Sequence, residues 1–116
     1  YDTHDGTGVR DYIHVMDIVS GHIMALKVLM KKPQITIVNL GTGIGYSVLD
    51  VVKSFEKISK QKVSFKVLGR RDGDVATSYS DPTFAIEALN WKAKYNLEEM
   101  CYDSWNYNIK NKAIFP

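Results

Sequence analysis

The sequence predicts a small α/β protein built on a parallel β-α-β unit with flanking helices. Two apolar runs of strand length, residues 35–40 and 63–68, enclose a stretch, 48–58, whose apolar residues recur at helical spacing. The 116 residues are 45% hydrophobic and 24% charged, which is typical of a folded protein and argues against disorder. This length favours a single unit, 1–116, and no apolar run reaches the about 18 residues of a membrane span, so we expect no membrane partner.

The first elements are a short extended segment at 10–14 and a helix at 16–31. Polar residues occupy only a narrow stripe of this helix, and helices so apolar are normally covered on more than one side. In so short a chain we expect part of that covering layer to be missing, which leaves open a role as an association surface. Pro33 ends the helix, and the β-branched run 35–40 fits a buried parallel strand.

The middle of the chain predicts a glycine-rich turn and a capped helix. The turn is Gly-Thr-Gly-Ile-Gly at 41–45, and Ser47 then caps a helix that ends near Ser59, with Asp50 completing a capping box. The second apolar run, 63–68, would return as a strand parallel to the first, through a right-handed crossover.

Residues 70–80 form a charged loop, after which Asp81 and Pro82 start a short helix that ends near Leu89. The aspartate suits the N-cap, and proline suits the first helical position.

A last helix starts at Asn96, with Glu99 as its capping-box partner, and runs to about Lys110. Cys101, in this helix, is the only cysteine, so an internal disulfide and a zinc site of paired cysteines are excluded, and a reducing, cytoplasmic location is expected. The face of the helix that we expect to be buried consists of Leu97, Met100, Cys101, Trp105 and Ile109.

Charge is unevenly distributed, although fifteen Lys and Arg against thirteen Asp and Glu give a net charge of only +2. Residues 53–71 hold seven basic side chains and one acidic one, which leaves open a stand-alone nucleotide-binding or RNA-binding module. A solvated surface is the stronger interpretation, because Lys53, Lys57 and Lys60 share a helical face without the interleaved aromatic residues of a base-stacking groove.

The glycine loop resembles a dinucleotide-binding turn only in part. Tyr46 stands where the third glycine of Gly-x-Gly-x-x-Gly belongs, and no acidic residue near position 60 could hold a ribose. A tight strand-to-helix turn is therefore the preferred interpretation, with a ligand phosphate at the helix N-terminus left open. A metal site is not expected, because His4, His14 and His22 are not spaced with Cys101 as metal ligands are. A catalytic triad is not expected either, because Ser47 is better explained as a helix cap than as a nucleophile.

Arginines beside a glycine make the loop at 70–74, Arg-Arg-Asp-Gly-Asp, a candidate phosphate site. A loop that follows a parallel strand lies at the edge of the sheet where α/β proteins bind ligands. A guanidinium there can bind a phosphate with two hydrogen bonds, while a nearby carboxylate accepts hydrogen bonds from sugar hydroxyl groups. A solvated, salt-bridged loop is the alternative. Arg10 follows two glycines and is a second candidate, weak on its own.

Several motifs in fixed order resemble the carboxyl-terminal part of the UDP-galactose 4-epimerase family, in the extended short-chain dehydrogenase group. They are Arg-Asp-Tyr-Ile-His-Val-Met-Asp at 10–17, Asn-Leu-Gly-Thr-Gly-Ile-Gly-Tyr-Ser-Val at 39–48, Arg-Arg-Asp-Gly-Asp at 70–74 and Leu-Asn-Trp at 89–91. The resemblance runs along the whole chain.

This resemblance implies that the chain binds a UDP-sugar. By similarity, Arg10 and Arg71 would hold the diphosphate and Asp74 the uridine ribose, with Asp72 and Gly73 shaping the loop. No residue of this chain is implied as catalytic.

The resemblance also places Ser78 where family members differ in side-chain size near the hexose. A bulky residue there is thought to exclude N-acetylated sugars, so Ser78 leaves room for UDP-N-acetylglucosamine.

Finally, the resemblance implies an amino-terminal Rossmann half that binds NAD and is absent from this chain. Neither the family's Gly-x-x-Gly-x-x-Gly fingerprint nor its Tyr-x-x-x-Lys pair occurs here. The whole enzyme would invert C4 of the hexose through an NAD-dependent 4-keto sugar, and the fragment alone would be inactive. The implied partners are the UDP-sugar, the Rossmann half and a second copy in a homodimer, without nucleic acid.

Overall fold

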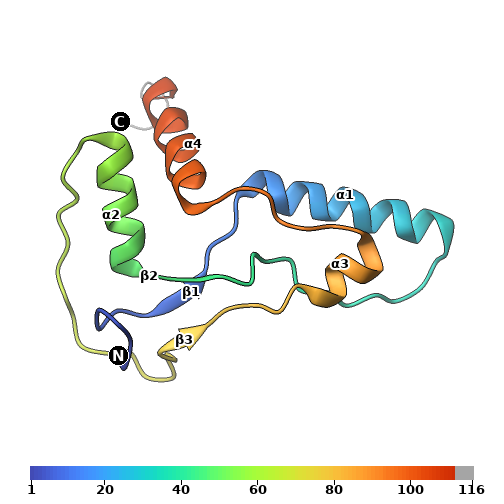
Figure 1. Ribbon diagram of the computed structural model, residues 1–116, viewed down its shortest axis with the longest axis horizontal. Coiled ribbons are helices and arrows are strands. Elements are labelled where there is room, and N and C mark those ends of the chain that lie inside the picture. Colours follow the sequence, from blue (N-terminus) through green and yellow to red (C-terminus); the bar gives the residue numbers. More distant parts are fainter. Residues whose placement is uncertain (112–116) are drawn as a thin grey trace.

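A computed structural model describes residues 1–111 as a small α/β structure with four helices and a three-stranded mixed sheet (Figure 1). The α/β class was predicted correctly. The elements follow the order β1 (Val9–Asp11), α1 (Val15–Lys31), β2 (Gly45–Ser47), α2 (Val48–Ser59), β3 (Thr77–Ser78), α3 (Thr83–Leu89) and α4 (Leu97–Lys110).

The central strand of the sheet is β1. It pairs antiparallel with β2, where Arg10 lies opposite Tyr46, and parallel with β3, where Arg10 lies opposite Ser78. A further backbone bond, from Val9 N to Ala76 O at 2.8 Å, extends the pairing with β3. The sheet therefore brings Arg10 beside the loop that precedes β3, more than sixty residues away in sequence.

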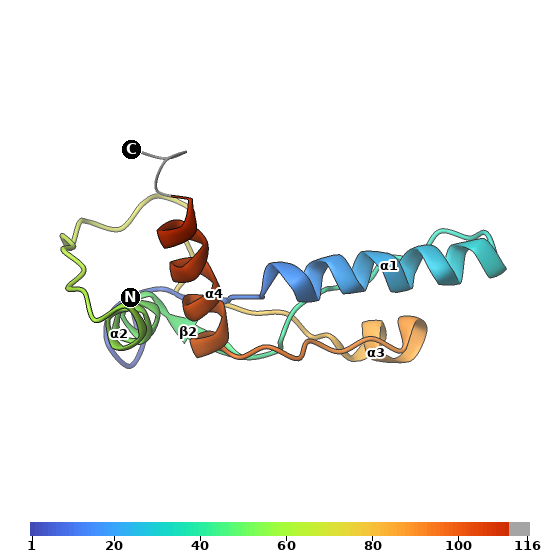
Figure 2. The same cartoon turned by 90° about the horizontal axis from the view of Figure 1, so that it is seen from above.

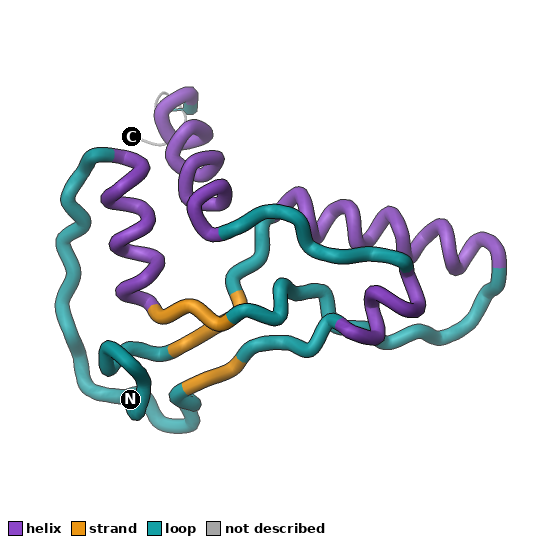
Figure 3. Tube along the Cα trace, in the orientation of Figure 1, coloured by secondary structure: helices purple, strands orange, loops and turns teal. Residues whose placement is uncertain are grey.

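The predicted parallel β-α-β unit was wrong. Residues 35–40 and 63–68 are both extended loops, drawn in teal in Figure 3, and they lie on opposite sides of the molecule. Ile35 and Ile37 are 94% and 83% exposed, and Val67 is 78% exposed. An apolar run becomes a strand only beside a partner strand, and no described segment of this chain pairs with either run.

Helix α1 confirms the helix predicted at 16–31, and one of its apolar faces is uncovered. The core consists of Ala85, Leu89 and Trp91, against which Met24 and Val28 of α1 pack. Figure 2 shows α3 along one side of α1, with none of the described elements on the other. Five of the exposed apolar residues of α1 recur every three or four positions, as on a helix face that packs, and we call them the α1 stripe: Val15, Val19, Ile23, Leu26 and Met30.

Helix α2 begins with the predicted capping box. Ser47 Oγ accepts from Asp50 N at 2.9 Å, and the Asp50 carboxylate accepts from Ser47 N at 3.0 Å. These bonds satisfy N–H groups that the first helical turn leaves unpaired.

Helix α4 packs against α2 and also begins with its predicted capping box, formed by Asn96 and Glu99. The rings of Phe55 and Trp105 meet edge to face at 5.7 Å between centroids. Among the residues expected to be buried on α4, Leu97 and Cys101 are buried and Met100 and Trp105 are half-buried. Ile109 was predicted wrongly: it is 44% exposed, because the last turn of α4 projects past α2 (Figure 1).

Helix α3 begins at Thr83, slightly later than predicted. Pro82, and not Asp81, is the N-cap residue, and the Asp81 carboxylate accepts a hydrogen bond from Thr83 N at 2.9 Å in the turn that leads into the helix. None of the helices in the described part of the chain has the length and apolar character that a membrane span requires.

Candidate functional site

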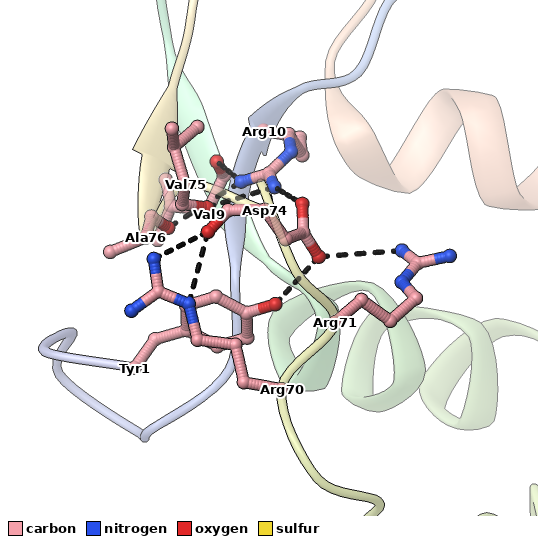
Figure 4. A network of polar contacts seen from close by, with 8 residues as sticks. All are labelled: Tyr1, Val9, Arg10, Arg70, Arg71, Asp74, Val75 and Ala76. Carbon is pink, nitrogen blue, oxygen red and sulfur yellow. Dashed lines mark hydrogen bonds and ion pairs between the residues drawn. The ribbon is translucent and has the colours of Figure 1, made fainter.

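The carboxylate of Asp74 joins residues from three separate parts of the chain (Figure 4). It accepts from an Arg10 terminal nitrogen at 2.7 Å, from the Tyr1 hydroxyl at 2.6 Å and from Arg71 at 3.4 Å. These bonds, that from Tyr1 first and then the charges of the two arginines, hold the pKa of Asp74 below its usual range. The group is therefore an ionised acceptor at neutral pH.

Arg10 is fixed in place by β1 and by the segment that leads into β3. Its two terminal nitrogens donate to the carbonyls of Val9 and Val75 at 2.7 and 2.9 Å, and more weakly to that of Ala76. With the bond to Asp74, these contacts use the terminal N–H groups, whereas the Nε–H has no acceptor among the described residues and can serve a ligand.

Arg71 has the more accessible guanidinium. Its side chain is 86% exposed, and its contact with Asp74 is the longest of that carboxylate's ion pairs. Gly73 adopts φ +76°, a left-handed conformation that favours glycine, so it permits the turn that returns Asp74 toward Arg71. Asp72 lies at the exposed tip of this turn, and its carboxylate forms no hydrogen bond with the described residues.

Tyr1 was missed as a site residue, and Arg70, although part of the candidate loop at 70–74, had no role of its own assigned. Arg70 Nε donates to the Asp74 carbonyl at 3.0 Å, and its guanidinium lies 5.2 Å from the centre of the Tyr1 ring, over the ring face. The bond to Asp74 raises the pKa of the Tyr1 phenol, which therefore stays protonated and donates. A single tyrosine carries no sequence pattern that could have revealed this contact.

A cavity of about 600 Å³ opens beside these residues. Tyr1, Arg10, Arg71 and Asp74 form its polar side, and its volume lies in the range of about 300–1,000 Å³ typical of ligand sites. The opposite walls come from α2 and from the extended run before the arginine loop, and they include Val48, Leu49, Val52, Phe65, Val67 and Leu68. The site can thus receive a ligand with an apolar or aromatic part and an anionic, hydroxyl-bearing part.

Ser78 lies in a second, smaller cavity. This cavity of about 450 Å³ is lined by Ser78 and Asn39, and it shares Arg10 with the larger one. The structure therefore brings Arg10, Arg71, Gly73 and Asp74 to one site, with Ser78 on the other side of Arg10.

The glycine loop packs against Asp11 rather than standing open. Asp11 accepts from the N–H groups of Thr42 and Gly43, each at 3.1 Å, and from the hydroxyl of Ser80. Burial would raise the pKa of Asp11, but these hydrogen bonds outweigh it and lower the pKa. A Cβ at Gly41 would lie 2.5 Å from the Asp11 carboxylate and still closer to Ser80, which explains the glycine there. The loop is a tight turn, as preferred from sequence.

The N-terminus of α2 is likewise occupied by the protein itself. Val48 N donates to the Gly8 carbonyl at 3.2 Å, and Asp50 N donates to Ser47. The structure therefore argues against phosphate binding at this helix end, because the N–H groups that would bind the phosphate already have partners in the protein.

The side chains of His4, Asp5 and Asp50 offer ligand atoms within 4.8 Å of one another. Asp5 accepts hydrogen bonds from Ser47 and Thr7, and Asp50 caps α2, so hydrogen bonds within the protein account for both carboxylates.

Two of the lysines in 53–71 are paired with glutamates. Lys57 pairs with Glu98 and Lys62 with Glu56, while Lys53 and Lys60 are exposed, as expected for a solvated helix face. These pairs reduce the excess positive charge of the surface.

An arginine–aspartate turn beside a ligand-sized cavity is suited to a ligand that carries phosphate and hydroxyl groups. Residues 2–104 match the family model described as GDP-mannose 4,6 dehydratase. The chain belongs to this family.

Within the family, the chain is similar to UDP-glucose 4-epimerases. It is 54% identical to that of Pasteurella multocida over 111 residues, covering 96% of this chain and 33% of the relative. To the human enzyme it is 51% identical over 115 residues, 99% of this chain and 33% of the relative. The chain thus spans about a third of the length of these relatives, which confirms the resemblance seen in the sequence motifs.

Solved structures show the same similarity. The UDP-glucose-4-epimerase of Stenotrophomonas maltophila, with bound NAD and formylated UDP-arabinopyranose, superposes with a TM-score of 0.92 at 45% identity, covering 98% of this chain and 34% of that one. The enzyme from Bifidobacterium longum, in complex with NAD+ and UDP, gives 0.91 at 43% identity, covering 99% and 34%.

Proposed function

We propose that this chain is the UDP-sugar-binding part of a UDP-glucose 4-epimerase, an enzyme that inverts C4 of the hexose in UDP-glucose and UDP-galactose. Its relatives carry that name, and the similar enzyme from Bifidobacterium longum was crystallised with UDP. Since the chain spans about a third of those relatives, the complete activity requires protein beyond these residues.

The convergence of Arg10 and Arg71 on the Asp74 carboxylate carries the proposal. Both guanidiniums lie at the polar side of the larger cavity, where a diphosphate between them would be bound by two positive charges. Asp74 would then accept hydrogen bonds from the hydroxyl groups of the uridine ribose, and Asp72 and Gly73 would shape the turn that positions Asp74. Arg10 lines both cavities, so it suits a ligand whose nucleoside lies in the larger cavity and whose hexose lies near Ser78 in the smaller one.

The residues of this chain do not fit NAD. The N–H groups of the glycine loop bind Asp11, and the loop lacks the third glycine of the fingerprint. We assign NAD, the group that exchanges a hydride with C4, to a Rossmann half outside these residues. The contribution of this chain is to hold the UDP group so that the hexose is correctly oriented.

The same Rossmann half is the partner that the exposed apolar surface suggests. It would cover the α1 stripe and the exposed side of the run 35–40, formed by Ile35 and Ile37, whereas Val38 and Leu40 pack against the core of this chain. A homodimer and a cytoplasmic location, with Cys101 as a free thiol, remain part of the proposal.

Titration of UDP by calorimetry against this chain and its Arg71→Ala variant tests the site. Each charge-assisted bond to the diphosphate contributes about 1.5–3 kcal/mol, so the variant should bind UDP about 10- to 100-fold more weakly. Lys53→Ala is the matched control, because Lys53 is exposed on α2 and does not line the cavity. Equal affinity in the Arg71 variant would remove Arg71 from the site.

A chimera tests whether this chain functions as the UDP-sugar-binding part of a complete epimerase. In the chimera, this chain replaces the 111 matched residues of the Bacillus subtilis UDP-glucose 4-epimerase, to which it is 51% identical. We expect the chimera to interconvert UDP-glucose and UDP-galactose and the 116-residue chain alone to be inactive. Turnover by the chain alone would refute the proposal.

The alternative of an RNA-binding module through residues 53–71 predicts affinity for RNA that falls steeply with salt. The pairing of Lys57 and Lys62 with glutamates weakens that interpretation. A filter-binding assay at two salt concentrations, with Lys53→Ala as the variant, would test it.

A further inference from the structure

Tyr1 presents a second hydroxyl-binding group beside Asp74. Its phenol donates its only hydrogen to Asp74 Oδ2 at 2.6 Å, and both side chains line the larger cavity. A phenol that has donated its hydrogen keeps oxygen lone pairs that can accept from a ligand. Tyr1 therefore offers an acceptor to the cavity.

The Asp74 carboxylate offers a second open hydrogen-bond acceptor. An ionised carboxylate offers about four lone-pair positions. Oδ2 accepts hydrogen bonds from Tyr1 and, at 3.4 Å, from Arg71, whereas within residues 1–111 Oδ1 accepts only from Arg10. One position on Oδ1 is left, so the pair presents two acceptors, one on Asp74 and one on Tyr1.

The tyrosine ring is held in place for this task. Arg70 lies over the ring face at 5.2 Å from its centre and donates to the Asp74 carbonyl at 3.0 Å. Tyr1, Asp74 and Arg70 thus form a closed ring of contacts (Figure 4). Groups fixed before the ligand arrives lose little conformational entropy on binding, which makes their hydrogen bonds more effective.

We propose that the Tyr1 hydroxyl and the Asp74 carboxylate together recognise a vicinal diol, so that the site selects a ribonucleotide over its dideoxy analogue. Two adjacent acceptors match two adjacent hydroxyl donors, and a sugar without them would leave both acceptors unpaired. This inference rests on the proposed function, because it takes the UDP ribose as the occupant, and it adds Tyr1 as a specificity-determining residue of that site.

The test compares UDP with 2′,3′-dideoxy-UDP by calorimetry, in the chimera and in its Tyr1→Phe variant. We expect the chimera to prefer UDP by about tenfold or more, and Tyr1→Phe to weaken UDP about five- to tenfold while changing dideoxy-UDP less than about twofold. Unchanged binding of dideoxy-UDP also shows that the variant is folded. Tyr102→Phe is the matched control, since Tyr102 is exposed on α4 and outside the cavity.

Two results would overturn the inference. If Tyr1→Phe weakens both ligands equally, Tyr1 supports the loop without contacting the diol. If Tyr1→Phe leaves the affinity for UDP itself unchanged, Tyr1 takes no part in binding. If the unmodified chimera binds neither ligand, the proposed function itself fails, which distinguishes the two failures.

Discussion

Arg10 is the residue on which the geometry of the site depends. It stands at the centre of the sheet, opposite Tyr46 on one side and Ser78 on the other, and it borders both cavities. Its terminal nitrogens hold the segment before β3 against β1, so the same guanidinium shapes the site and borders the ligand. Losing it would therefore disturb the position of Asp74 as well as the charge.

Ser78 is predicted to set the tolerance for N-acetylated sugars. Filling the smaller cavity by Ser78→Tyr should lower turnover of UDP-N-acetylglucosamine by the chimera at least about tenfold through steric exclusion, while UDP-glucose turnover changes little. Thr77→Tyr is the control, because Thr77 is the adjacent residue of β3 and does not line that cavity. The hypothesis is wrong if the unmodified chimera does not act on the acetylated substrate, or if the ratio of the two rates is unchanged.

At the residue scale, the sequence predicted the charged members of the site and missed the neutral one. Arg71, Gly73 and Asp74 lie within one short motif, so their proximity follows from the chain itself. Tyr1 contacts Asp74 across 73 residues, and the sheet register that makes this contact is set by strands of only two or three residues. Pairings that are so short and so distant in sequence leave no periodic signal.

The start of α2 is linked to the first loop of the chain through Asp5. Its carboxylate accepts from the Ser47 hydroxyl and from the N–H and hydroxyl of Thr7, at 2.9 and 2.7 Å. The bond from Ser47 is the main cause that lowers the pKa of Asp5 to about 2, with the bonds from Thr7 adding to it. The linkage fixes the loop that leads into β1 and hence the position of Arg10.

This lowered pKa predicts how stability at this end depends on pH. Because the folded-state pKa is about 2 and that of an unfolded aspartate is about 3.9, ionised Asp5 stabilises the fold above about pH 4 and loses this effect as pH falls toward 2. Asp5→Asn in the chimera should therefore lower the thermal midpoint at pH 6, and the difference from the parent should shrink between pH 4 and pH 2. Asp2→Asn, at an exposed neighbouring position, is the control. A difference that stays constant across this range would contradict the linkage.

At the element scale, helices were predicted well and strands were not. The capping boxes at Ser47 and Asn96 are local signals, and both helices begin where these signals place them. The apolar runs 35–40 and 63–68 do predict segments suited to burial, but an apolar run cannot show whether the protein that buries it belongs to the same stretch of chain. That is why Ile35 and Ile37 of the first run and most of the second run are exposed here.

For its size, the molecule exposes a large surface. Its accessible surface is 8628 Å², whereas a compact monomer of this mass exposes about 6,400 Å². Its dimensions of 49 × 39 × 22 Å and its small number of fully buried apolar residues describe the same open shape. Much of the excess is apolar and includes the α1 stripe and the run 35–40. A surface of this kind is typical of an interface.

The run 35–40 gives the sharpest test of this interface. Ile35 and Ile37 are 94% and 83% exposed, and none of the described backbone groups pairs with the backbone of 33–41, so both side chains and backbone are available to a strand of the Rossmann half. Burying an isoleucine contributes about 1.5–3 kcal/mol, so the double variant Ile35→Ser, Ile37→Ser should lower the free energy of unfolding of the chimera by about 3 kcal/mol or more. Urea unfolding measures this loss. In the 116-residue chain the same variant should instead reduce self-association in sedimentation experiments, because there the two side chains face solvent. An unchanged unfolding free energy in the chimera would show that these residues stay exposed in the longer protein, and the Rossmann half would then not cover this run.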